Sequence, residues 1–206
     1  NNKLNPELKV SSNIGGVRAT ETVAKDIFFI TPRRGTKILN EFPVFTWNKT
    51  QGESEFQLTI LTEELDVIKT VTLKDTIYKY SEKDPKLEKG LTYICIVKPV
   101  TSAKQSEYQT FTIAADTEAV QMTGRIKETE TLLSSADELT KSILLGTTFE
   151  ALELYSDAYA SYAKAIKLAP NEKAYRKMLA DLLVKVNLIK EATYLSGYNP
   201  ADNNSK

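Results

Sequence analysis

Acidic side chains near the ends of expected strands are the residues of this chain whose type could support chemistry. Four of them fall close together in the sequence: Glu63, Glu64, Asp66 and Asp75. Two carboxylates are enough for glycoside hydrolysis. However, no second cluster of acids, amides and aromatic residues marks a substrate cleft, and the acids do not follow the alternating oxygen-ligand pattern of an EF-hand. We therefore expect solvated turns here, with no catalytic residues, metal ligands or cofactor.

The cysteine and histidine content restricts the chemistry further. The 206 residues include no histidine and one cysteine, Cys95. Without histidine the chain lacks the usual general base near neutral pH, the triads built on it and most catalytic zinc sites. Cys95 lies in the apolar run Leu91–Val97, where a thiol acts as a small hydrophobic group. The sequence predicts that Cys95 is inert and that the protein is not an enzyme.

Two further groups of residues could bind small ligands. The first is a set of cations beside Gly35: Arg33, Arg34 and Lys37. We expect a solvated turn there rather than an anion site. The second is a set of tyrosines on expected strands: Tyr78, Tyr80, Tyr93 and Tyr108. Such rings could form a sugar-binding platform, but we expect most of them to be core residues or cross-strand pairs.

The overall charge and hydropathy exclude some classes of partner. Lysine plus arginine number 27, as do aspartate plus glutamate, so there is no basic field of the kind that holds nucleic acid or an anionic membrane surface. No apolar stretch approaches the roughly 20 residues that span a bilayer, so we expect no transmembrane segment. The chain begins at Asn1 without methionine, which is compatible with removal of a signal peptide or with trimming of the expressed protein.

The regular secondary structure expected from the sequence begins with short β-strands. From Ile27, runs rich in β-branched and aromatic residues are separated by turn signals. Seven such runs occur: Ile27–Ile30, Val44–Trp47, Phe56–Leu61, Val67–Leu73, Ile77–Tyr80, Leu91–Val97 and Tyr108–Ile113. Strict alternation places Phe56, Leu58 and Ile60 on one face of their strand. The pattern predicts a β-sandwich with Trp47 buried in its core.

Helices are expected after Ala114, where the hydrophobic period changes from two to about 3.6. Thr117 can cap a first helix over about 118–134, and the serine-to-glutamate spacing of Ser135–Glu138 predicts a capping box that opens the next. The chain is then expected to divide into four parts: a flexible arm at 1–25, a β-sandwich at 26–115, a helical domain at 117–197 and a disordered tail at 198–206.

The helical part repeats itself at an offset of 34 residues. This offset aligns five pairs of similar size: Leu145 with Leu179, Gly146 with Ala180, Phe149 with Leu183, Tyr155 with Ile189, and Ala158 with Ala192. The period and these positions resemble the tetratricopeptide repeat (TPR) family. That resemblance implies a binding groove lined from the first helix of each repeat. Its residues here would be Ile143, Thr147, Glu150, Lys177, Asp181 and Val184.

The β part also carries a resemblance. Four segments, Thr31–Thr36, Phe42–Trp47, Phe56–Ile60 and Leu87–Tyr93, resemble immunoglobulin-like modules of exported bacterial proteins, several of which continue into a TPR-like tail. This uncharacterised family implies an α+β protein of two domains, located in the periplasm or at the cell surface. The function it implies is a non-catalytic scaffold or adaptor that binds a protein or peptide. A carbohydrate-binding or carbohydrate-degrading surface protein, or a structural subunit of an envelope assembly, remains an alternative. The oligomeric state stays open.

Overall fold

The computed structural model describes residues 27–50 and 52–196. The expected arm at 1–25 and tail at 198–206 lie outside the described residues. The chain forms two compact units. The β unit comprises 27–50, 52–125 and the segment Leu152–Ser156, and the helical unit comprises Ile126–Ala151 and 157–196. A β region followed by a helical region was predicted, and this order is confirmed.

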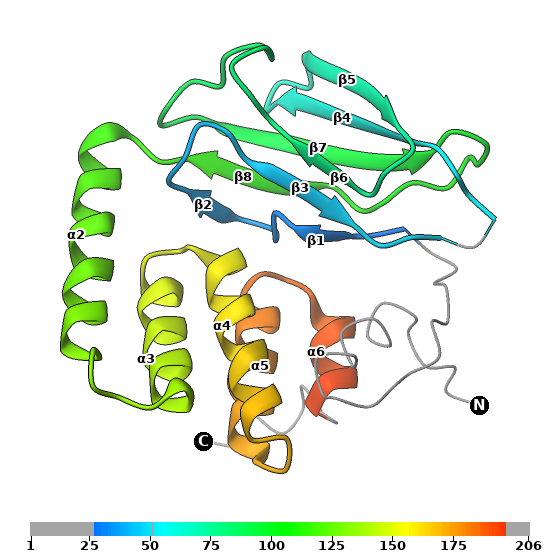
Figure 1. Ribbon diagram of the computed structural model, residues 1–206. Helices are drawn as coiled ribbons and strands as arrows, with labels where there is room; N and C mark the ends of the chain where they lie inside the picture. Colours follow the sequence, from blue (N-terminus) through cyan, green and yellow to red (C-terminus); the bar gives the residue numbers. More distant parts are fainter. Residues whose placement is uncertain (1–26, 51, 197–206) are drawn as a thin grey trace. The chain divides into compact units, whose positions relative to one another are not determined.

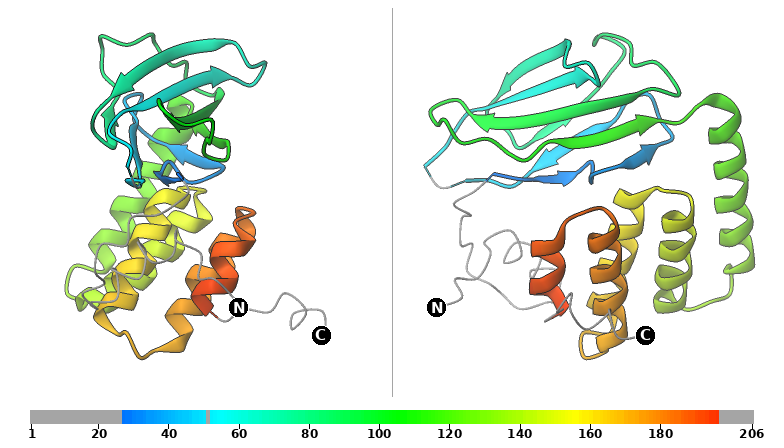
Figure 2. Two further views of the ribbon diagram at one scale, coloured as in Figure 1. Left: turned by 90° about the vertical axis from the view of Figure 1, so that its right-hand side faces the viewer. Right: turned by 180° about the vertical axis from the view of Figure 1, so that it is seen from behind.

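The β unit consists of two sheets that face each other (Figure 1 and Figure 2). The smaller sheet is antiparallel, with the order β1 (Phe29–Thr31), β3 (Val44–Trp47), β6 (Ile77–Lys79). The larger has the order β2 (Thr36–Ile38), β8 (Gln109–Ile113), β7 (Thr92–Pro99), β4 (Phe56–Thr62), β5 (Val67–Leu73). Its strands are antiparallel except that β2 runs parallel to β8. The chain therefore changes sheets between β1 and β2.

The segment Leu152–Ser156 belongs to the β unit through hydrogen bonds with β2 and the residues before it. The amide of Lys37 donates to the carbonyl of Glu153 at 2.8 Å. The Ser156 hydroxyl accepts from the amide of Arg33 at 2.9 Å, and the Ser156 amide donates to the hydroxyl of Thr36 at 3.2 Å. The Lys37 amide and the Thr36 hydroxyl of this short strand thus find partners in the segment.

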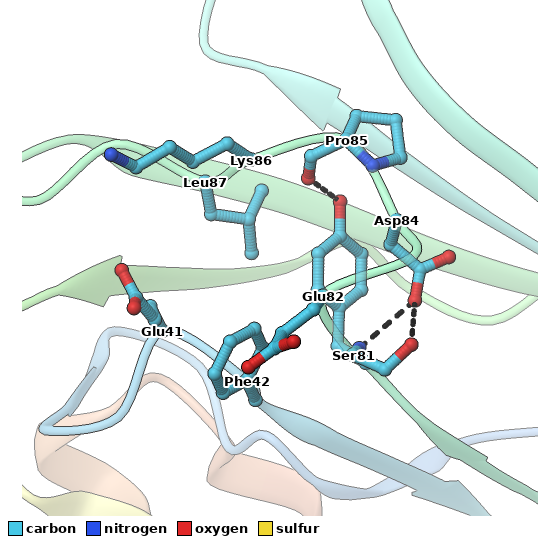
Figure 3. Close-up of a pocket in the computed structure, with 9 residues that line it drawn as sticks. Glu41, Phe42, Ser81, Glu82, Asp84, Pro85, Lys86 and Leu87 are labelled. Atoms are coloured by element: carbon cyan, nitrogen blue, oxygen red, sulfur yellow. Dashed lines mark hydrogen bonds between the residues drawn. The ribbon is translucent and has the colours of Figure 1, made fainter.

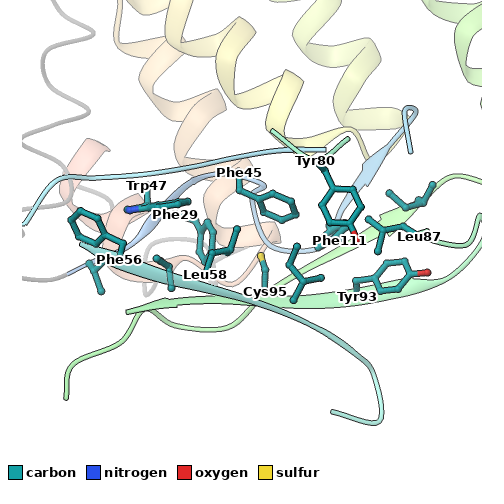
Figure 4. Packing of buried hydrophobic residues seen from close by; sticks show 14 residues of the cluster. Phe29, Phe45, Trp47, Phe56, Leu58, Tyr80, Leu87, Tyr93, Cys95 and Phe111 are labelled. Atoms are coloured by element: carbon teal, nitrogen blue, oxygen red, sulfur yellow. The ribbon is translucent and has the colours of Figure 1, made fainter. Parts of the chain in front are cut away.

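The core of the β unit lies between the two sheets (Figure 4). Alternation along β4 buries Phe56, Leu58 and Ile60, as predicted. The Trp47 side chain, on β3, is 1% exposed, and its ring lies edge-on to Phe56 with centroids 6.0 Å apart. The predicted burial of Trp47 is confirmed, because large apolar side chains such as Phe29 and Phe56 pack against its ring and exclude water.

Cys95 lies on β7 at the centre of this core and is fully buried. Burial raises the pKa of its thiol well above the ordinary value, since the thiolate would lose its hydration. We expect the folded protein to resist a bulky thiol reagent and to react only after unfolding in urea. Stopped-flow absorbance with Ellman's reagent measures both rates. A folded-state rate equal to that of the unfolded chain would contradict this prediction.

The helices follow the sheets in sequence. Their bounds are α2 (Asp116–Leu132), α3 (Glu138–Ala151), α4 (Tyr155–Leu168), α5 (Lys173–Lys185) and α6 (Ile189–Ser196). The residue that caps α3 is Asp137, whose carboxylate accepts from the Thr140 amide at 2.9 Å; the predicted cap, Ser135, lies two residues earlier. Among the described residues, no helix is both long enough and apolar enough to cross a bilayer.

The 34-residue offset of the sequence recurs in the backbone. Helix α4 begins at Tyr155 and α6 begins at Ile189, 34 residues later. The residues two positions before these starts, Glu153 and Asn187, have φ angles of 60° and 61°. Left-handed residues commonly end helices, and here they follow α3 and α5 at equivalent places. The helical unit thus contains two consecutive helix pairs of similar backbone.

Gly146 shows why a small residue is needed on α3. A Cβ atom placed on it would lie 2.5 Å and 2.6 Å from the Cε1 and Cδ1 atoms of Tyr162 on α4. The Tyr162 side chain is buried, and its hydroxyl donates to the Glu150 carboxylate at 2.9 Å, so the ring has little room to move. The close approach of these two helices therefore depends on glycine at this position.

Gly146→Ala is expected to lower the free energy of unfolding by about 1 kcal/mol, because overpacking outweighs the gain in helix propensity. Gly124→Ala on α2 is the matched control, since a Cβ there meets nothing within 4 Å; it should stabilise by roughly 0.5–1 kcal/mol. Urea unfolding followed by circular dichroism measures both. A stabilising effect of Gly146→Ala would show that the ring can move aside.

Candidate functional site

The predicted groove residues lie on the first helices of the two pairs. Ile143, Thr147 and Glu150 are on α3, and Lys177, Asp181 and Val184 are on α5. Thr147, Lys177 and Asp181 are exposed and the other three are half-buried. The two helices are connected by an ion pair at 3.3 Å between Glu150 and Lys185. This ion pair joins the two helices through Glu150, one of the predicted residues, and Lys185, which was not predicted.

The charges of this surface are largely paired with one another. Lys177 and Asp181 form an ion pair at 2.6 Å along α5. Glu150 binds Lys185 and also accepts from the Tyr162 hydroxyl. Burial and the hydrogen bond to Glu150 raise the pKa of Tyr162, which therefore remains a neutral donor. Sequence reasoning missed the contact of Glu150 with Tyr162, because the two residues lie on different helices. A ligand of this surface would meet apolar groups and paired charges rather than a net charge.

The cations beside Gly35 do not form the solvated turn that the sequence predicted. Arg33 is buried, and Arg34 pairs with Glu107 at 2.9 Å. Lys37 pairs with Glu118 at 2.6 Å and with Glu153 at 2.7 Å. The hydrogen bonds that Lys37 donates to these two carboxylates raise its pKa. The expectation was wrong because residues far away in the sequence fold over this turn and neutralise its charges.

The tyrosines and the acidic turns behave largely as predicted. Tyr80 and Tyr93 are buried and Tyr78 is half-buried, whereas Tyr108 is 52% exposed. Most of these rings therefore pack in or against the core. The acids near the strand ends are exposed: Glu63, Glu64, Asp66 and Asp75. Within the described ranges, no group of three histidine, cysteine or acidic side chains could hold a metal ion.

A buried carboxylate that sequence reasoning missed lies between the edges of the two sheets. The Asp84 side chain is 5% exposed. It accepts from the Tyr78 hydroxyl at 2.5 Å and from the Ser81 amide at 2.9 Å, and it pairs with Lys69 at 3.0 Å. Burial alone would raise the pKa of Asp84, but these hydrogen bonds outweigh it and lower the pKa. Lys69 belongs to β5 and Tyr78 to β6, so Asp84 joins the edge strands of both sheets.

Beside Asp84 the β unit has a pocket of about 210 Å³ (Figure 3). Its lining comes from the residues before β3 and from the segment between β6 and β7: Glu41, Phe42, Tyr80, Ser81, Glu82, Asp84, Pro85, Lys86 and Leu87. The Tyr80 hydroxyl donates to the Pro85 carbonyl. Burial, with the negative charge of Asp84, raises the pKa of Tyr80 to about 12, so this hydroxyl stays protonated.

No protein-family model matches the chain, and no curated protein matches it at a significant level.

Proposed function

We propose that the chain combines an immunoglobulin-like β-sandwich with TPR-like helices and acts as a non-catalytic scaffold or adaptor for protein partners in the bacterial cell envelope. The observation that carries this proposal is the backbone repeat of the helical unit. Stacked helix pairs of this kind present a surface that holds extended or helical peptides. The groove residues on α3 and α5 are the binding surface of this proposal.

The strand order supports the immunoglobulin-like part. Such modules place strands A, B and E in one sheet and strands G, F, C and C′ in the other. Here β1, β3 and β6 correspond to the first set, and β8, β7, β4 and β5 to the second. Near the start of β7, the Tyr93 hydroxyl accepts from the Glu88 amide at 2.6 Å and donates to the Glu88 carbonyl at 3.3 Å. This is the arrangement of a tyrosine corner.

Affinity capture from the native organism tests the proposed function. The bait would be the full chain, compared with Thr147→Arg and with a matched control, Ala160→Arg, whose position on α4 is also exposed. A partner retained by the parent chain and the control but lost with Thr147→Arg would support the groove. Identical captured sets for all three baits would contradict it. Subcellular fractionation tests the envelope location, and recovery of the protein only in the cytoplasm would contradict that part.

A further inference from the structure

We propose that the pocket of the β unit, lined by Glu41, Phe42, Tyr80, Glu82 and Leu87, receives the arginine side chain of a peptide partner. The proposal rests on the interaction function above and deepens it, because it names a side chain that the partner would present. It concerns a different unit from the groove on α3 and α5, so each site can be tested without the other.

The walls of the pocket are held in place by backbone hydrogen bonds. The Tyr80 amide donates to the Pro43 carbonyl at 3.0 Å, which joins the segment before β3 to the end of β6. The Phe42 amide donates to the Asn40 side chain at 2.8 Å. Next to these contacts, Val44 on β3 is paired with Lys79 on β6. A ligand would therefore enter a site that is already formed, without the cost of ordering a loop.

Part of the inner surface of the pocket is apolar. Leu87 is 1% exposed and Tyr80 is 4% exposed, so they form its floor. Phe42 is half-buried and packs against the core of the β unit, which leaves part of the side chain open to the pocket. An aliphatic stem would bury its methylene groups against these side chains, and a planar cation would stack on an aromatic ring.

The charge of the pocket favours a cation. Glu41 and Glu82 form no ion pair with another described residue at 4 Å or less, and both line the pocket together with Phe42 (Figure 3). Asp84 differs, because Lys69 and Tyr78 already satisfy it.

Two lysines lie near these acids. Lys86 also lines the pocket but forms no ion pair with another described residue at 4 Å or less, and Lys89, which feels the charge of Glu41, is paired with Asp116 at 2.7 Å. The charges of Glu41 and Glu82 are therefore the ones that a ligand can complement.

Arginine fits this combination better than lysine does. A guanidinium group is planar, stays charged, pairs with carboxylates through a fork of donors and stacks on aromatic faces. An ammonium group is a strongly hydrated point charge that gains less from an aromatic wall. The pocket offers two carboxylates and the Phe42 ring together, which matches the donors and the flat face of a guanidinium.

The test is a titration of the full chain, labelled with ¹⁵N, followed by amide chemical shifts. The probes are N-acetyl-arginine amide, its neutral isostere N-acetyl-citrulline amide, and N-acetyl-lysine amide. We expect saturable shifts confined to residues 40–43 and 80–88 with the arginine probe. Binding of the citrulline probe should be at least about tenfold weaker, because hydrogen bonds to a charged group are lost. Absence of saturable shifts, or equal binding of the citrulline or lysine probe, would overturn the proposal.

Variants test the residues named. Glu82→Gln and Glu41→Gln should each weaken binding of the arginine probe several-fold, whereas Glu64→Gln, an exposed acid on the β4–β5 connection, should leave it unchanged. Unperturbed amide shifts outside 40–43 and 80–88 would show that each variant is folded. Unchanged affinity in both pocket variants would overturn the assignment. Arginine binding that persists while capture through α3 and α5 fails would refute the groove alone, and the converse result would refute this pocket alone.

Discussion

Asp84→Asn is expected to lower the free energy of unfolding of the β unit by about 2–3 kcal/mol. The variant keeps the size of the side chain but removes the charge that Tyr78 and Lys69 contact at 2.5 Å and 3.0 Å. The loss should be smaller than that of a fully buried pair, because the Lys69 side chain is 28% exposed and can be hydrated. Urea unfolding followed by fluorescence measures the effect, since Trp47 is the only tryptophan and lies in this core.

The stability that Asp84 contributes is expected to depend on pH. The pKa of Asp84 is lower in the folded protein than in the unfolded chain. The stability that Asp84 contributes is therefore fully present above the unfolded pKa, about 3.9, and is lost as the pH falls through the folded value. The difference in stability between the parent and Asp84→Asn should thus be constant from about pH 7 to pH 5 and shrink below about pH 4. A difference that grows on acidification would contradict the prediction.

Asp66→Asn is the matched control for both measurements. Asp66 is exposed in the turn between β4 and β5, and its replacement should change the stability by no more than about 0.5 kcal/mol. An equally small loss of stability for Asp84→Asn would show that Asp84 does not stabilise the contact between the two edge strands.

The second large effect is expected from Ala158→Leu, which should cost about 1–3 kcal/mol. Ala158 lies on α4 with no exposed surface, and its counterpart in the repeat, Ala192, is equally buried. A leucine side chain would need space that neighbouring groups already fill. The measurement is the urea midpoint at unchanged slope, followed by circular dichroism at 222 nm.

Ala160→Leu provides a control of the same residue type on the same helix. Ala160 is exposed, so this change should stay within about 0.5 kcal/mol. Equal effects of the two substitutions would mean that the register of the 34-residue repeat is wrong. The assignment of Lys177 and Asp181 to a binding surface depends on that register and would fail with it.

Local periodicity explains what could be predicted. Alternation along Phe56–Leu61 placed the core face of β4 correctly, because successive side chains of a strand point to opposite faces. The recurrence at 34 residues located the helix pairs, since equal spacing of small and large residues requires similar packing. These patterns can be read from the order of residues within one segment, so they can be recognised without knowledge of the rest of the fold.

Contacts between distant segments explain what could not be predicted. Strand β2 has three residues and was missed, because its pairing with β8 joins positions 75 apart, such as Thr36 and Phe111. Lys37 was expected to be solvated, yet its partner Glu118 is 81 residues away.

Lys69 on β5 is another residue whose environment could not be predicted from the sequence. It is paired with buried Ile60 and faces inward. Alternation predicts an apolar residue at such a position, and the charge is tolerated because Asp84 pairs with it.

Local sequence patterns were sufficient to predict the order of the β and helical regions, the inward face of β4, the burial of Trp47 and the spacing of the helix pairs. The folded chain alone shows that Asp84 meets Tyr78 and Lys69 between the sheet edges, that a pocket forms beside them, and that Glu150 contacts Tyr162 and Lys185. Whether a polar side chain is solvated, paired or buried depends on which groups from distant parts of the sequence lie within a few ångströms of it in the folded protein.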